Sequence, residues 1–374
     1  MKHLKIMQVS RMYYPVHGGI ERVVQDIAEG LKDNTDMTVL TCQSRGHGTV
    51  EEIHGVTVHR CSSLGTVCSL PVSFSFLSEF KRLSKEQDII HIHMPFPLAD
   101  LACLLSGYKG NVVVWWHSDV VRQKKLMFFY RPIMERFLKR VDAIVVATEG
   151  HILGSSYLGD YKDKCHVIPF GVDKTVLQRA DEYLVHCGER RNKELTFLFV
   201  GRLVYYKGCS VLLEAFSKLH GGTLHIVGDG PLKHELEQQA DALGICSRVC
   251  FTGSLPHEEL YREFAECDVF VLPSIAKSEA FGIVQIEAMA YNKPVINTNL
   301  PSGVPYVSLD KITGLTVEPG DAEGLAGAMR WMMDHPKERI TLGSNAGKRA
   351  REYYSIDYML EQVDALYQTI GQEG

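Results

Sequence analysis

The sequence predicts an α/β protein built from two doubly wound domains in tandem. Its 374 residues exceed the usual length of one domain. Short apolar segments of strand length alternate with segments of helical periodicity along the whole chain. This alternation stops in a polar stretch and begins again at Leu195. Two parallel sheets, each covered by helices, explain that restart better than one large sheet does.

The first half of the chain, residues 1–173, is expected to form the first domain. Helical spacing is clearest from Ile20 to Ala28, where apolar residues recur every three or four positions. A second helix is predicted around Phe76–Lys85. The apolar segments that predict strands are Lys5–Ser10, Thr38–Thr41, Val56–Arg60, Asp88–His93, Val112–Trp116, Val141–Ala147 and His166–Pro169.

Residues 174–193 are polar and contain two clusters of charge, so they are predicted to be an irregular linker. The second half then repeats the alternation of strands and helices. Its predicted strands are Leu195–Val200, Leu224–Val227, Val249–Thr252, Asp268–Leu272, Lys293–Ile296 and Gly314–Val317. Its last predicted helices are Ala322–Asp334, Lys337–Tyr353 and Asp357–Ile370.

The composition argues against several classes of protein. A net charge of −5 gives no reason to expect nucleic acid as a partner. No run approaches the roughly 18 apolar residues of a membrane span, and Met1–Lys5 leads into a strand without a signal peptide. The ten cysteines form no Cys-x-x-Cys pair. They are interpreted as reduced, mostly buried thiols of a cytoplasmic protein, with a secreted disulfide framework as the alternative.

The segment from Glu279 to Glu287 carries two acids around Phe281-Gly282. It lies between two apolar runs, so it is predicted to be the loop and helix of a strand–loop–helix–strand unit. Exposed amides at the helix N-terminus would attract an anion such as a diphosphate. The two acids would then grip the sugar hydroxyls and the ribose of a nucleotide-sugar. The alternative interpretation is a loop acid and a solvated helix acid without a ligand.

A pair of glycines, Gly18 and Gly19, stands between the first strand and the first helix. Glycines let the backbone approach an anion, so this loop is a candidate phosphate cradle. It lacks the Gly-x-Gly-x-x-Gly fingerprint of a dinucleotide site and the Gly-Lys-Ser/Thr of a P-loop. A structural turn is therefore the alternative.

Three histidines lie near the carboxyl ends of predicted strands. His91 and His93 share one face of their strand, because side chains alternate. His91 is expected in the core, whereas His93 lies at the strand end, where open α/β sheets bind ligands. His117 and Asp119 follow the next strand in the same way. For His117 the alternative is a core or capping role.

In the second half, Arg202 and Lys207 follow the first strand, and a Gly-Asp-Gly-Pro segment beginning at Gly228 follows the second. Together with the Gly18-Gly19 loop and the Glu279–Glu287 segment, this order of motifs resembles the retaining, nucleotide-sugar-dependent glycosyltransferases of family 4. That family has the GT-B architecture. The resemblance extends over nearly the whole chain, and its most specific motifs lie in the second half.

The resemblance implies two Rossmann-like domains that face each other across a cleft. Residues 1–173 would form the acceptor-side domain, residues 174–193 the linker and residues 194–352 the nucleotide-sugar donor domain. Residues 353–374 would form a C-terminal helix that crosses back and packs on the first domain.

The resemblance also implies a role for each candidate residue. Arg202 and Lys207 would hold the diphosphate and stabilise the charge that the leaving group gains, as a metal ion does elsewhere; the alternative is a pair of surface cations. Glu279 would bind sugar hydroxyls, and His117 would lie near the sugar's primary hydroxyl and the reacting centre. The residues with catalytic roles would be Glu279, His117, Arg202 and Lys207. Donor contacts would come from Gly18, Gly19, Arg202, Lys207, Gly228, Leu255, Glu279, Phe281, Gly282, Ile283 and Glu287, with Glu287 on the ribose, Gly228 and Leu255 at the base, and Val249 or Phe251 as further candidates there.

The chain contains no Asp-x-Asp tripeptide, which agrees with the metal-independent, cofactor-free transfer that the resemblance implies. The expected donor is GDP-mannose, because Asn299–Pro305 looks most like the mannosyltransferases of bacterial surface-polysaccharide assembly. The expected acceptor is a glycan or a polyprenyl-diphosphate-linked glycan. UDP- or dTDP-sugar donors carrying glucose, N-acetylglucosamine or rhamnose are alternatives. A nucleotide-sugar epimerase, a phosphorylase and a non-catalytic partner protein are the other classes.

A basic, aromatic stretch runs from Arg122 to Arg140, and its spacing predicts a helix. One interpretation is a helix packed on the core with a solvated cationic face. The other is an amphipathic surface that docks on anionic lipid, which would place the protein at the inner face of the cytoplasmic membrane.

Overall fold

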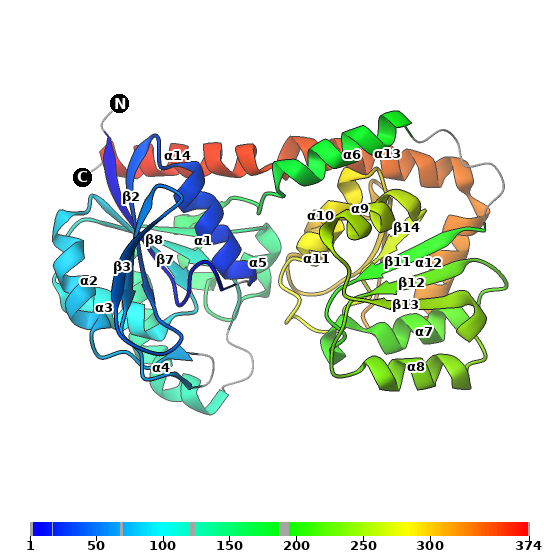
Figure 1. Cartoon of the computed structure of the whole chain (residues 1–374), viewed down its shortest axis with the longest axis horizontal. Helices are drawn as coiled ribbons and strands as arrows, with labels where there is room; N and C mark the ends of the chain where they lie inside the picture. Colours follow the sequence, from blue (N-terminus) through cyan, green and yellow to red (C-terminus); the bar gives the residue numbers. More distant parts are fainter. Residues whose placement is uncertain (1–2, 17, 68–69, 120–123, 187–193, 373–374) are drawn as a thin grey trace. The chain divides into compact units, whose positions relative to one another are not determined.

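The computed structural model describes residues 3–16, 18–67, 70–119, 124–186 and 194–372. The chain divides into two compact units, each with its own sheet (Figure 1). Unit 1 comprises Met1–Ala147, Ser155–Ile168 and Met359–Gly374, and unit 2 comprises Thr148–Gly154 and Pro169–Tyr358. The two sheets are those of a doubly wound α/β protein, which confirms the predicted fold class.

Unit 1 is built on an eight-stranded sheet with the order β10-β9-β8-β7-β1-β2-β4-β3. All neighbouring strands run parallel except β3, which pairs antiparallel with β4 at the edge. The central strands are buried over most of their length and are mostly apolar, with Gln8, His91 and His93 as buried polar exceptions. The strands are β1 (Leu4–Val9), β2 (Thr35–Cys42), β3 (Thr49–Ile53), β4 (Val56–Cys61), β7 (Ile89–Met94), β8 (Asn111–Trp116), β9 (Ala143–Val146) and β10 (Cys165–Val167), with a separate pair β5 (Thr66–Val67) and β6 (Leu70–Pro71).

The helices of unit 1 are amphipathic and bury one face against this sheet. Helix α1 buries Val23, Val24 and Ile27, which recur at the helical period. The C-terminal helix α14 buries Val363, Tyr367 and other residues, and its residues from Met359 onward belong to unit 1. The helices are α1 (Gly19–Gly30), α2 (Phe76–Leu83), α3 (Pro97–Ser106), α4 (Lys124–Arg140) and α14 (Ile356–Gln372), with short 3₁₀ turns at Ser84–Glu86 and Gly159–Lys164.

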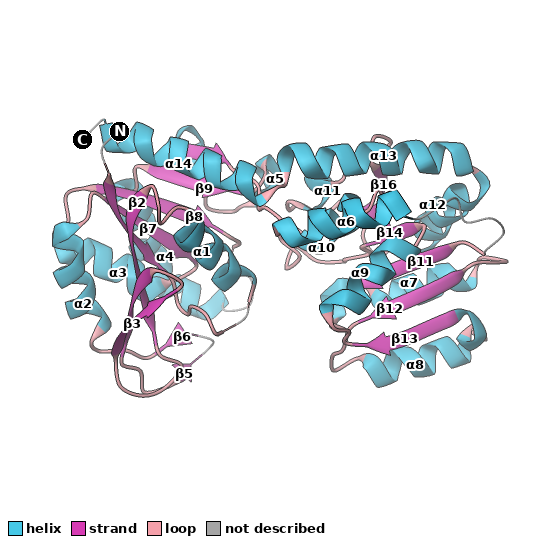
Figure 2. Cartoon of the chain, turned by 45° about the horizontal axis from the view of Figure 1, so that its top comes forward, coloured by secondary structure: helices cyan, strands magenta, loops and turns pink. Residues whose placement is uncertain are grey.

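Unit 2 has a six-stranded, all-parallel sheet with the order β13-β12-β11-β14-β15-β16. In order of appearance the strands therefore follow the 3-2-1-4-5-6 pattern of a doubly wound fold. Figure 2 shows this sheet with helices in front of it and behind it. The strands are β11 (Thr196–Val200), β12 (Thr223–Val227), β13 (Val249–Gly253), β14 (Val269–Val271), β15 (Val295–Thr298) and β16 (Gly314–Val317).

Two helical layers cover the sheet of unit 2. Helices α7, α8 and α12 contact one another on one side, and α6, α9, α10 and α13 contact one another on the other. The helices are α5 (Glu149–Gly154), α6 (Lys174–His186), α7 (Cys209–Ser217), α8 (Lys233–Ala242), α9 (His257–Glu266), α10 (Ile283–Ala290), α11 (Val304–Val307), α12 (Ala322–Asp334) and α13 (Pro336–Tyr353), with 3₁₀ turns at Tyr205–Lys207 and Cys246–Arg248.

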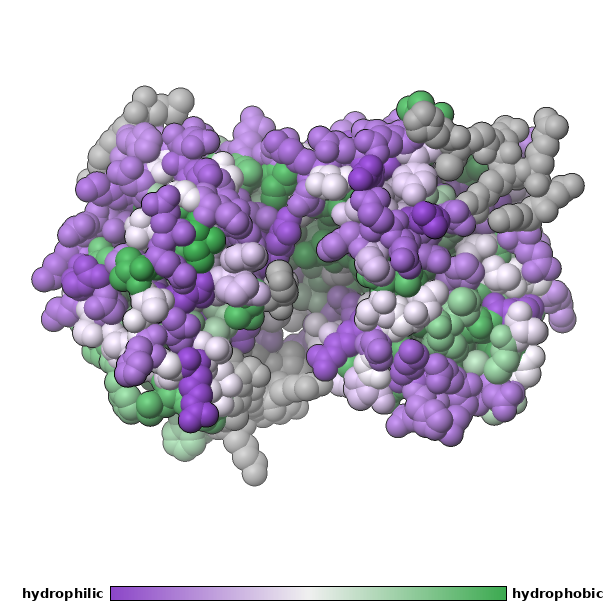
Figure 3. Space-filling model, viewed as in Figure 1, coloured by the Kyte–Doolittle hydropathy of each residue, from purple (hydrophilic) through white to green (hydrophobic). Residues whose placement is uncertain are grey.

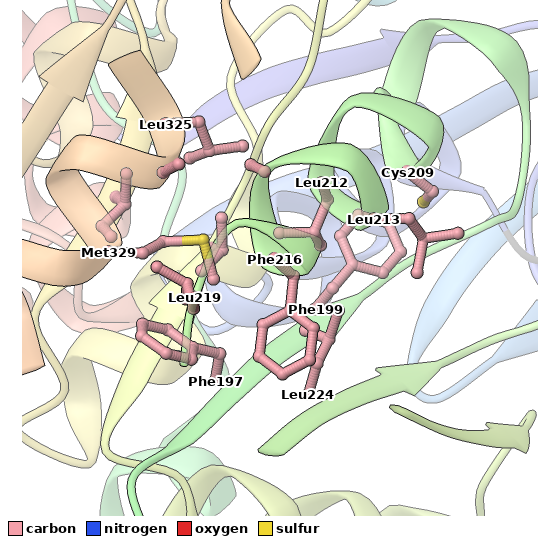
Figure 4. Packing of buried hydrophobic residues seen from close by; sticks show 14 of the residues in the cluster. Phe197, Phe199, Cys209, Leu212, Leu213, Phe216, Leu219, Leu224, Leu325 and Met329 are labelled. Carbon is pink, nitrogen blue, oxygen red and sulfur yellow. The ribbon is translucent and has the colours of Figure 1, made fainter. Parts of the chain in front are cut away.

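A buried apolar cluster fixes helices α7 and α12 against strand β11 (Figure 4). Phe197 and Phe199 point to the same face of β11 and meet Phe216 and Leu212 of α7. Met329 of α12 completes this layer. Burying one such side chain contributes about 1.5–3 kcal/mol, so the cluster holds β11 rigidly beneath the loop that follows it.

The predicted irregular linker is wrong for most of its length. Residues 174–186 form helix α6, in which Val176 and Ala180 are buried. Arg179 of α6 also bonds Glu258 at 2.8 Å. The prediction rested on the charge clusters. A charged helix can still pack when it carries a narrow apolar stripe, which Val176 and Ala180 provide here at positions i and i+4. Residues 187–193 lie outside the described part of the chain.

Most of the described cysteines are buried thiols. Those that are buried are Cys42, Cys61, Cys103, Cys209 and Cys267. No disulfide joins the described cysteines, and Cys246 and Cys250 are exposed. Cys68 and Cys187 lie outside the described residues.

On the surface seen in Figure 3, hydrophilic residues predominate in both units. Among the described residues, no helix is both long and apolar enough to span a bilayer.

Candidate active site

The candidate site of unit 2 lies at the point where its strand order reverses, between β11 and β14. In open α/β sheets, ligands bind outside the carboxyl ends of the strands at this point. Arg202 lies just past the end of β11, and Lys207 ends the 3₁₀ turn that follows. Glu279 lies in the loop after β14. The three predicted residues therefore come from the two loops that flank the reversal.

Lys207 and Glu279 form a direct ion pair. The Nζ of Lys207 lies 2.6 Å from Oε2 of Glu279, and their side chains are only 12% and 10% exposed. Ser274 Oγ donates to the same carboxylate oxygen at 3.1 Å. The ammonium has three N–H donors, so it can keep this contact and also donate to a phosphate oxygen. Arg202 is exposed at the surface of its loop.

Backbone contacts hold the two loops of this site together. The N–H of Ile275 donates to Tyr206 O at 2.8 Å, and Thr298 Oγ1 donates to Ser274 O at 2.6 Å. Gly208 has a φ of +71°, and a Cβ on it would stand 2.0 Å from Pro273 O. Only glycine fits this close approach without strain. The residue after Lys207 thus sets how near the lysine comes to the Glu279 loop.

Helix α10 begins at the end of the loop that carries Glu279, without a side-chain cap. Gly282 is its N-cap, with a φ of +72°, and it makes no side-chain cap. The first turn, which begins at Ile283, contains no acid. Phe281 is 3% exposed and packs edge-on against Phe170, with ring centroids 4.9 Å apart, so its side chain anchors the loop. The amides of the first turn can therefore serve an anion.

Two buried amide side chains, missed as functional candidates, shape the far side of the loop. Asn297 Nδ2 donates to Val304 O at 3.1 Å and to Ser308 O at 3.0 Å. Gln285 Nε2 donates to Phe281 O at 2.8 Å. These bonds tie β15 to α11 and the residue that follows it, and α10 to the loop that precedes it. A polar residue inside the apolar strand Val295–Thr298 was the available signal for Asn297.

The residues predicted for the ribose and base lie at the same edge of the sheet, with one exception. Gly228, at the end of β12, has a φ of +133°, and a Cβ there would meet Gly201 O at 2.1 Å. Leu255 is half-buried in the loop between β13 and α9. Phe251 lies within β13, but Val249 opens that strand at its amino end. Val249 is therefore separated from Leu255 by the length of the strand.

Glu287 lies in the second turn of α10 and is half-buried. It is within electrostatic range of Tyr261 on helix α9. The pKa of Tyr261 is raised first by burial and then by the charges of Asp173 and Glu287. Glu287 thus lies near helix α9, one turn beyond the helix end that Gly282 caps.

In unit 1, Gly18 and Gly19 stand where they were predicted, at the N-terminus of α1. The carboxylate of Glu21 folds back on Gly18, because a Cβ on Gly18 would lie 2.2 Å from Glu21 Oε2. Arg11 lies 3.8 Å from the same carboxylate. An acid in the first turn already satisfies the positive end of this helix. A phosphate bound here would have to displace it.

His117 and His93 meet in the core of unit 1. His93 Nδ1 lies 3.0 Å from His117 Nε2, and the side chains are 1% and 6% exposed. Burial holds the pKa of His93 well below its usual value. His91 is fully buried, as predicted, and burial lowers its pKa to about 3. His93, for which core and site roles were both open, contacts the predicted site histidine.

Asp119 has a structural position. Its Oδ1 accepts from Trp116 Nε1 at 3.1 Å and from Ser155 Oγ at 2.7 Å. Its Oδ2 accepts from the N–H of Ser156 at 3.0 Å. The carboxylate therefore ties the end of β8 to the segment around Ser155.

The basic, aromatic stretch forms helix α4, and its described part divides into two. Near its C-terminal end Met134, Phe137 and Leu138 are buried. Earlier in the helix Phe128 and Phe129 are 78% and 77% exposed. Arg122 lies outside the described residues. The core-packed face of the first interpretation is thus present, and the two exposed phenylalanines lie on earlier turns of the helix.

No group of three His, Cys, Asp or Glu side chains that could hold a metal ion occurs in the described part of the chain. A cation–carboxylate pair at the reversal of a doubly wound sheet, in loops that include the start of a helix without a side-chain cap, is an arrangement that can bind a phosphorylated ligand. Comparison with known proteins shows the family to which the chain belongs.

Residues 17–176 match the model of Glycosyltransferase Family 4, and residues 188–349 match that of Glycosyl transferases group 1. The O-antigen chain mannosyltransferase C of Escherichia coli is 33% identical over 371 residues, covering 98% of this chain and 99% of that protein. The D-rhamnosyltransferase WbpZ of Pseudomonas aeruginosa is 37% identical over 340 residues, covering 90% and 88%. The Anabaena protein HepE, solved in complex with UDP, superimposes with a TM-score of 0.75 at 19% identity, covering 98% and 100%. The chain therefore belongs to the family 4 glycosyltransferases of GT-B fold and resembles bacterial polysaccharide glycosyltransferases.

Proposed function

We propose that this glycosyltransferase moves a hexose, with retention of configuration, from GDP-mannose to a hydroxyl of a lipid-linked or growing surface glycan. The observation that carries the proposal is the Lys207–Glu279 ion pair at the strand reversal of unit 2. It sets a phosphate-binding cation directly beside an acid that can accept hydrogen bonds from sugar hydroxyls. A nucleotide-sugar has its diphosphate and its sugar side by side in the same way.

The leaving diphosphate would be stabilised by cations that the protein itself supplies. Negative charge grows on the diphosphate oxygen as the glycosidic bond breaks. Lys207 and Arg202 would meet that charge, and the first-turn amides of α10 would add donors of fixed direction. No bound metal ion is needed for this stabilisation, and none is proposed. Arg202 is exposed and can reorient towards the ligand.

The chemistry at the sugar would proceed on one face of the ring. Retention without a covalent intermediate requires the acceptor hydroxyl to attack from the side on which the diphosphate leaves. The leaving phosphate oxygen then takes the acceptor proton. Glu279, already bonded to Lys207 and Ser274, would hold sugar hydroxyls rather than act as a nucleophile. His117 would contact the primary hydroxyl of the sugar.

The names of two relatives support a donor of the mannose series. One relative is an O-antigen mannosyltransferase, and the other is a D-rhamnosyltransferase. D-Rhamnose is 6-deoxymannose, so the two sugars differ only at the primary hydroxyl that His117 is proposed to bind. A site that hydrogen-bonds a hydroxyl discriminates strongly against an analogue that lacks it. The two donors are therefore alternatives for one site. The similarity to the D-rhamnosyltransferase WbpZ makes a 6-deoxymannose donor the second candidate.

Thermal-shift and turnover measurements with the full-length protein test the donor. GDP-mannose, GDP-rhamnose, UDP-glucose and dTDP-rhamnose are compared at equal concentration, and a bound donor raises Tm by mass action. GDP-mannose is expected to give the largest shift, and Glu279→Gln to reduce it. Product analysis by proton NMR then reports the anomeric configuration. A larger shift with a UDP-sugar, or an inverted product, would overturn the corresponding part of the proposal.

The acceptor is proposed to be presented at a membrane surface. Helix α4 exposes the Phe128–Phe129 pair, and the basic side chains Arg131, Arg136 and Lys139 follow on the same helix. Amphipathic helices of this composition bind anionic lipid surfaces through apolar insertion and charge. A lipid-linked acceptor would then reach unit 1 without leaving the bilayer.

A further inference from the structure

A hydrogen-bonded network of buried polar side chains runs through the core of unit 1 and ends at His117. His93 Nε2 lies 2.8 Å from Gln8 Oε1, and His93 Nδ1 lies 3.0 Å from His117 Nε2. Gln8 Nε2 donates to Tyr367 Oη at 2.7 Å, and Tyr367 Oη lies 2.5 Å from His91 Nδ1. Apart from His117, at 6%, each of these side chains is at most 1% exposed. Buried polar groups linked in this way hold one another in place.

The side chains of this network come from four elements that are distant in sequence. Gln8 comes from β1, His93 from β7, His117 from the end of β8 and Tyr367 from the C-terminal helix α14. Trp115 of β8 stacks on the rings of His93 and His117, with centroids 6.1 and 5.8 Å apart and planes 12° and 11° apart. The imidazole planes are therefore fixed by stacking as well as by hydrogen bonds.

The hydrogen bonds have a direction, which follows from the chemistry of each group. A carboxamide oxygen only accepts, so the contact with Gln8 Oε1 places the proton of His93 on Nε2. His93 is neutral, because burial disfavours its charged form. Its Nδ1 then has a lone pair and accepts from His117. The proton on the His117 ring in that bond is consequently on Nε2.

We propose that Gln8, His93 and Tyr367 are positioning residues that hold the imidazole of His117 in its Nε2–H tautomer for the sugar contact proposed above. The bond made by one ring nitrogen sets the state of the other. The sugar contact rests on the function proposed above, whereas the tautomer is a property of the protein without any ligand. Tyr367 gives the C-terminal helix a part in the site, because it orients the carboxamide of Gln8.

The tautomer is measured by NMR of the ¹⁵N-histidine-labelled, full-length protein without any ligand. Two-bond proton–nitrogen correlations distinguish a protonated ring nitrogen from an unprotonated one, and the His117→Gln variant identifies the His117 signals. The expected result is a protonated Nε2 and an unprotonated Nδ1. His93→Leu should produce a mixture of tautomers. His93→Asn should restore the wild-type pattern, because its carbonyl oxygen can stand near the place of Nδ1. A protonated Nδ1 in neutral wild-type His117, or an unchanged pattern in His93→Leu, would refute the proposal.

Kinetics test whether the tautomer matters for turnover. Tyr367→Phe should lower kcat about 10-fold and His93→Leu about 100-fold, with donor KM nearly unchanged, since misorientation of a catalytic contact costs this much. His93→Asn should recover most of the loss. Tyr108→Phe is the matched control. It removes a tyrosine hydroxyl of the same unit, which donates to Asp88 O at 2.8 Å and is not part of the network that contains Tyr367.

The outcomes separate the two proposals. An equal loss of kcat in Tyr108→Phe would show that the Tyr367 effect is only general destabilisation, and would refute the positioning role. If wild-type protein transferred no sugar from any donor, the proposed function would fail while the NMR result still decided the tautomer. Far-UV circular dichroism of each variant confirms that it is folded before its kinetics are compared.

Discussion

The ammonium of Lys207 lies 2.6 Å from the carboxylate of Glu279, and both side chains are nearly buried. The two residues come from different loops, 72 positions apart, that meet only because β11 and β14 are neighbours in the sheet. One group favours phosphate and the other favours sugar hydroxyls. In the proposed function, their contact would make the recognition of the two parts of a nucleotide-sugar interdependent, so a change at either residue would affect both.

Substitution of either partner should therefore remove most activity. We expect Lys207→Met and Glu279→Gln each to lower kcat/KM by at least about 100-fold, because a charge that acts on the leaving group or the sugar is lost. Lys207→Met should also destabilise the fold by about 3 kcal/mol, since it leaves Glu279 buried without its cation. Steady-state kinetics and urea unfolding measure the two effects. Arg202→Met is the control for folding: it should lose activity with stability changed by less than about 0.5 kcal/mol, because Arg202 is exposed. Turnover near wild-type in either partner variant would remove the pair from the site.

Gly208 should be intolerant of any side chain. In Gly208→Ala the new Cβ would lie 2.0 Å from Pro273 O, so the lysine loop and the Glu279 loop must separate. We expect a stability loss of roughly 2–4 kcal/mol, from strain and steric overlap, together with a fall in kcat/KM. Gly244→Ala separates the two causes, because Gly244 also has a positive φ, of +67°, but no atom within 4 Å of the added Cβ. It should cost about 1 kcal/mol and leave activity intact. Equal stability losses in the two variants would contradict the role assigned to the close approach.

Turnover is expected to be independent of divalent metal ions. In the proposed function, Lys207 and Arg202 would supply the positive charge that a metal ion provides in other transferases. Treatment of the purified enzyme with EDTA, followed by assay in metal-free buffer, should leave kcat and donor KM unchanged. The control is addition of Mg²⁺ or Mn²⁺ to the treated enzyme. A strict requirement for either ion would show that the cations of the protein are insufficient.

Asp100 should make the free energy of unfolding fall as the pH rises from about 4 to about 7. Burial raises the pKa of this carboxyl to about 7 in the folded protein, against a bond from Tyr130 that lowers it. In this range the folded state holds a proton that the unfolded state has released, so each added pH unit disfavours folding by up to about 1.4 kcal/mol.

The effect of Asp100 is isolated by comparison with Asp100→Asn. His91, whose pKa is lowered to about 3, acts in the opposite direction between that value and its usual 6.5. The difference between wild type and variant, measured by urea unfolding at several pH values, removes this and all other shared contributions. A difference that does not change between pH 4 and 7 would mean that Asp100 is ionised in the folded state throughout.

Helix α4 should bind anionic membranes through its exposed aromatic pair. Flotation with liposomes that contain phosphatidylglycerol should carry the wild-type protein, and high salt should weaken the binding. The Phe128→Ser, Phe129→Ser double variant should remain in solution. Leu105→Ser, which replaces a 63% exposed apolar residue of α3 in the same unit, should float like wild type. Failure of the wild type to float with anionic liposomes would leave these phenylalanines without a membrane role.

Local pattern was enough to predict the architecture and the loops of the candidate site. Apolar runs of strand length and helical periodicities predicted both doubly wound sheets. The polar residues that follow β11 and β14 drew attention to Arg202, Lys207 and Glu279 before their positions were known. This information is local, because strand, turn and helix preferences depend on neighbours in sequence.

The contacts that make these residues a site were decided by tertiary structure. The Lys207–Glu279 pair, the carboxylate of Glu21 against Gly18, and the bond between Gln8 and Tyr367 had no signal in the sequence pattern. The last of these joins residues 359 positions apart. The sequence by itself determined which residues stand at strand ends and helix starts. Which of them touch is set by the order of strands and by close packing of helices on the sheet, and neither is encoded in the local periodicity of the chain.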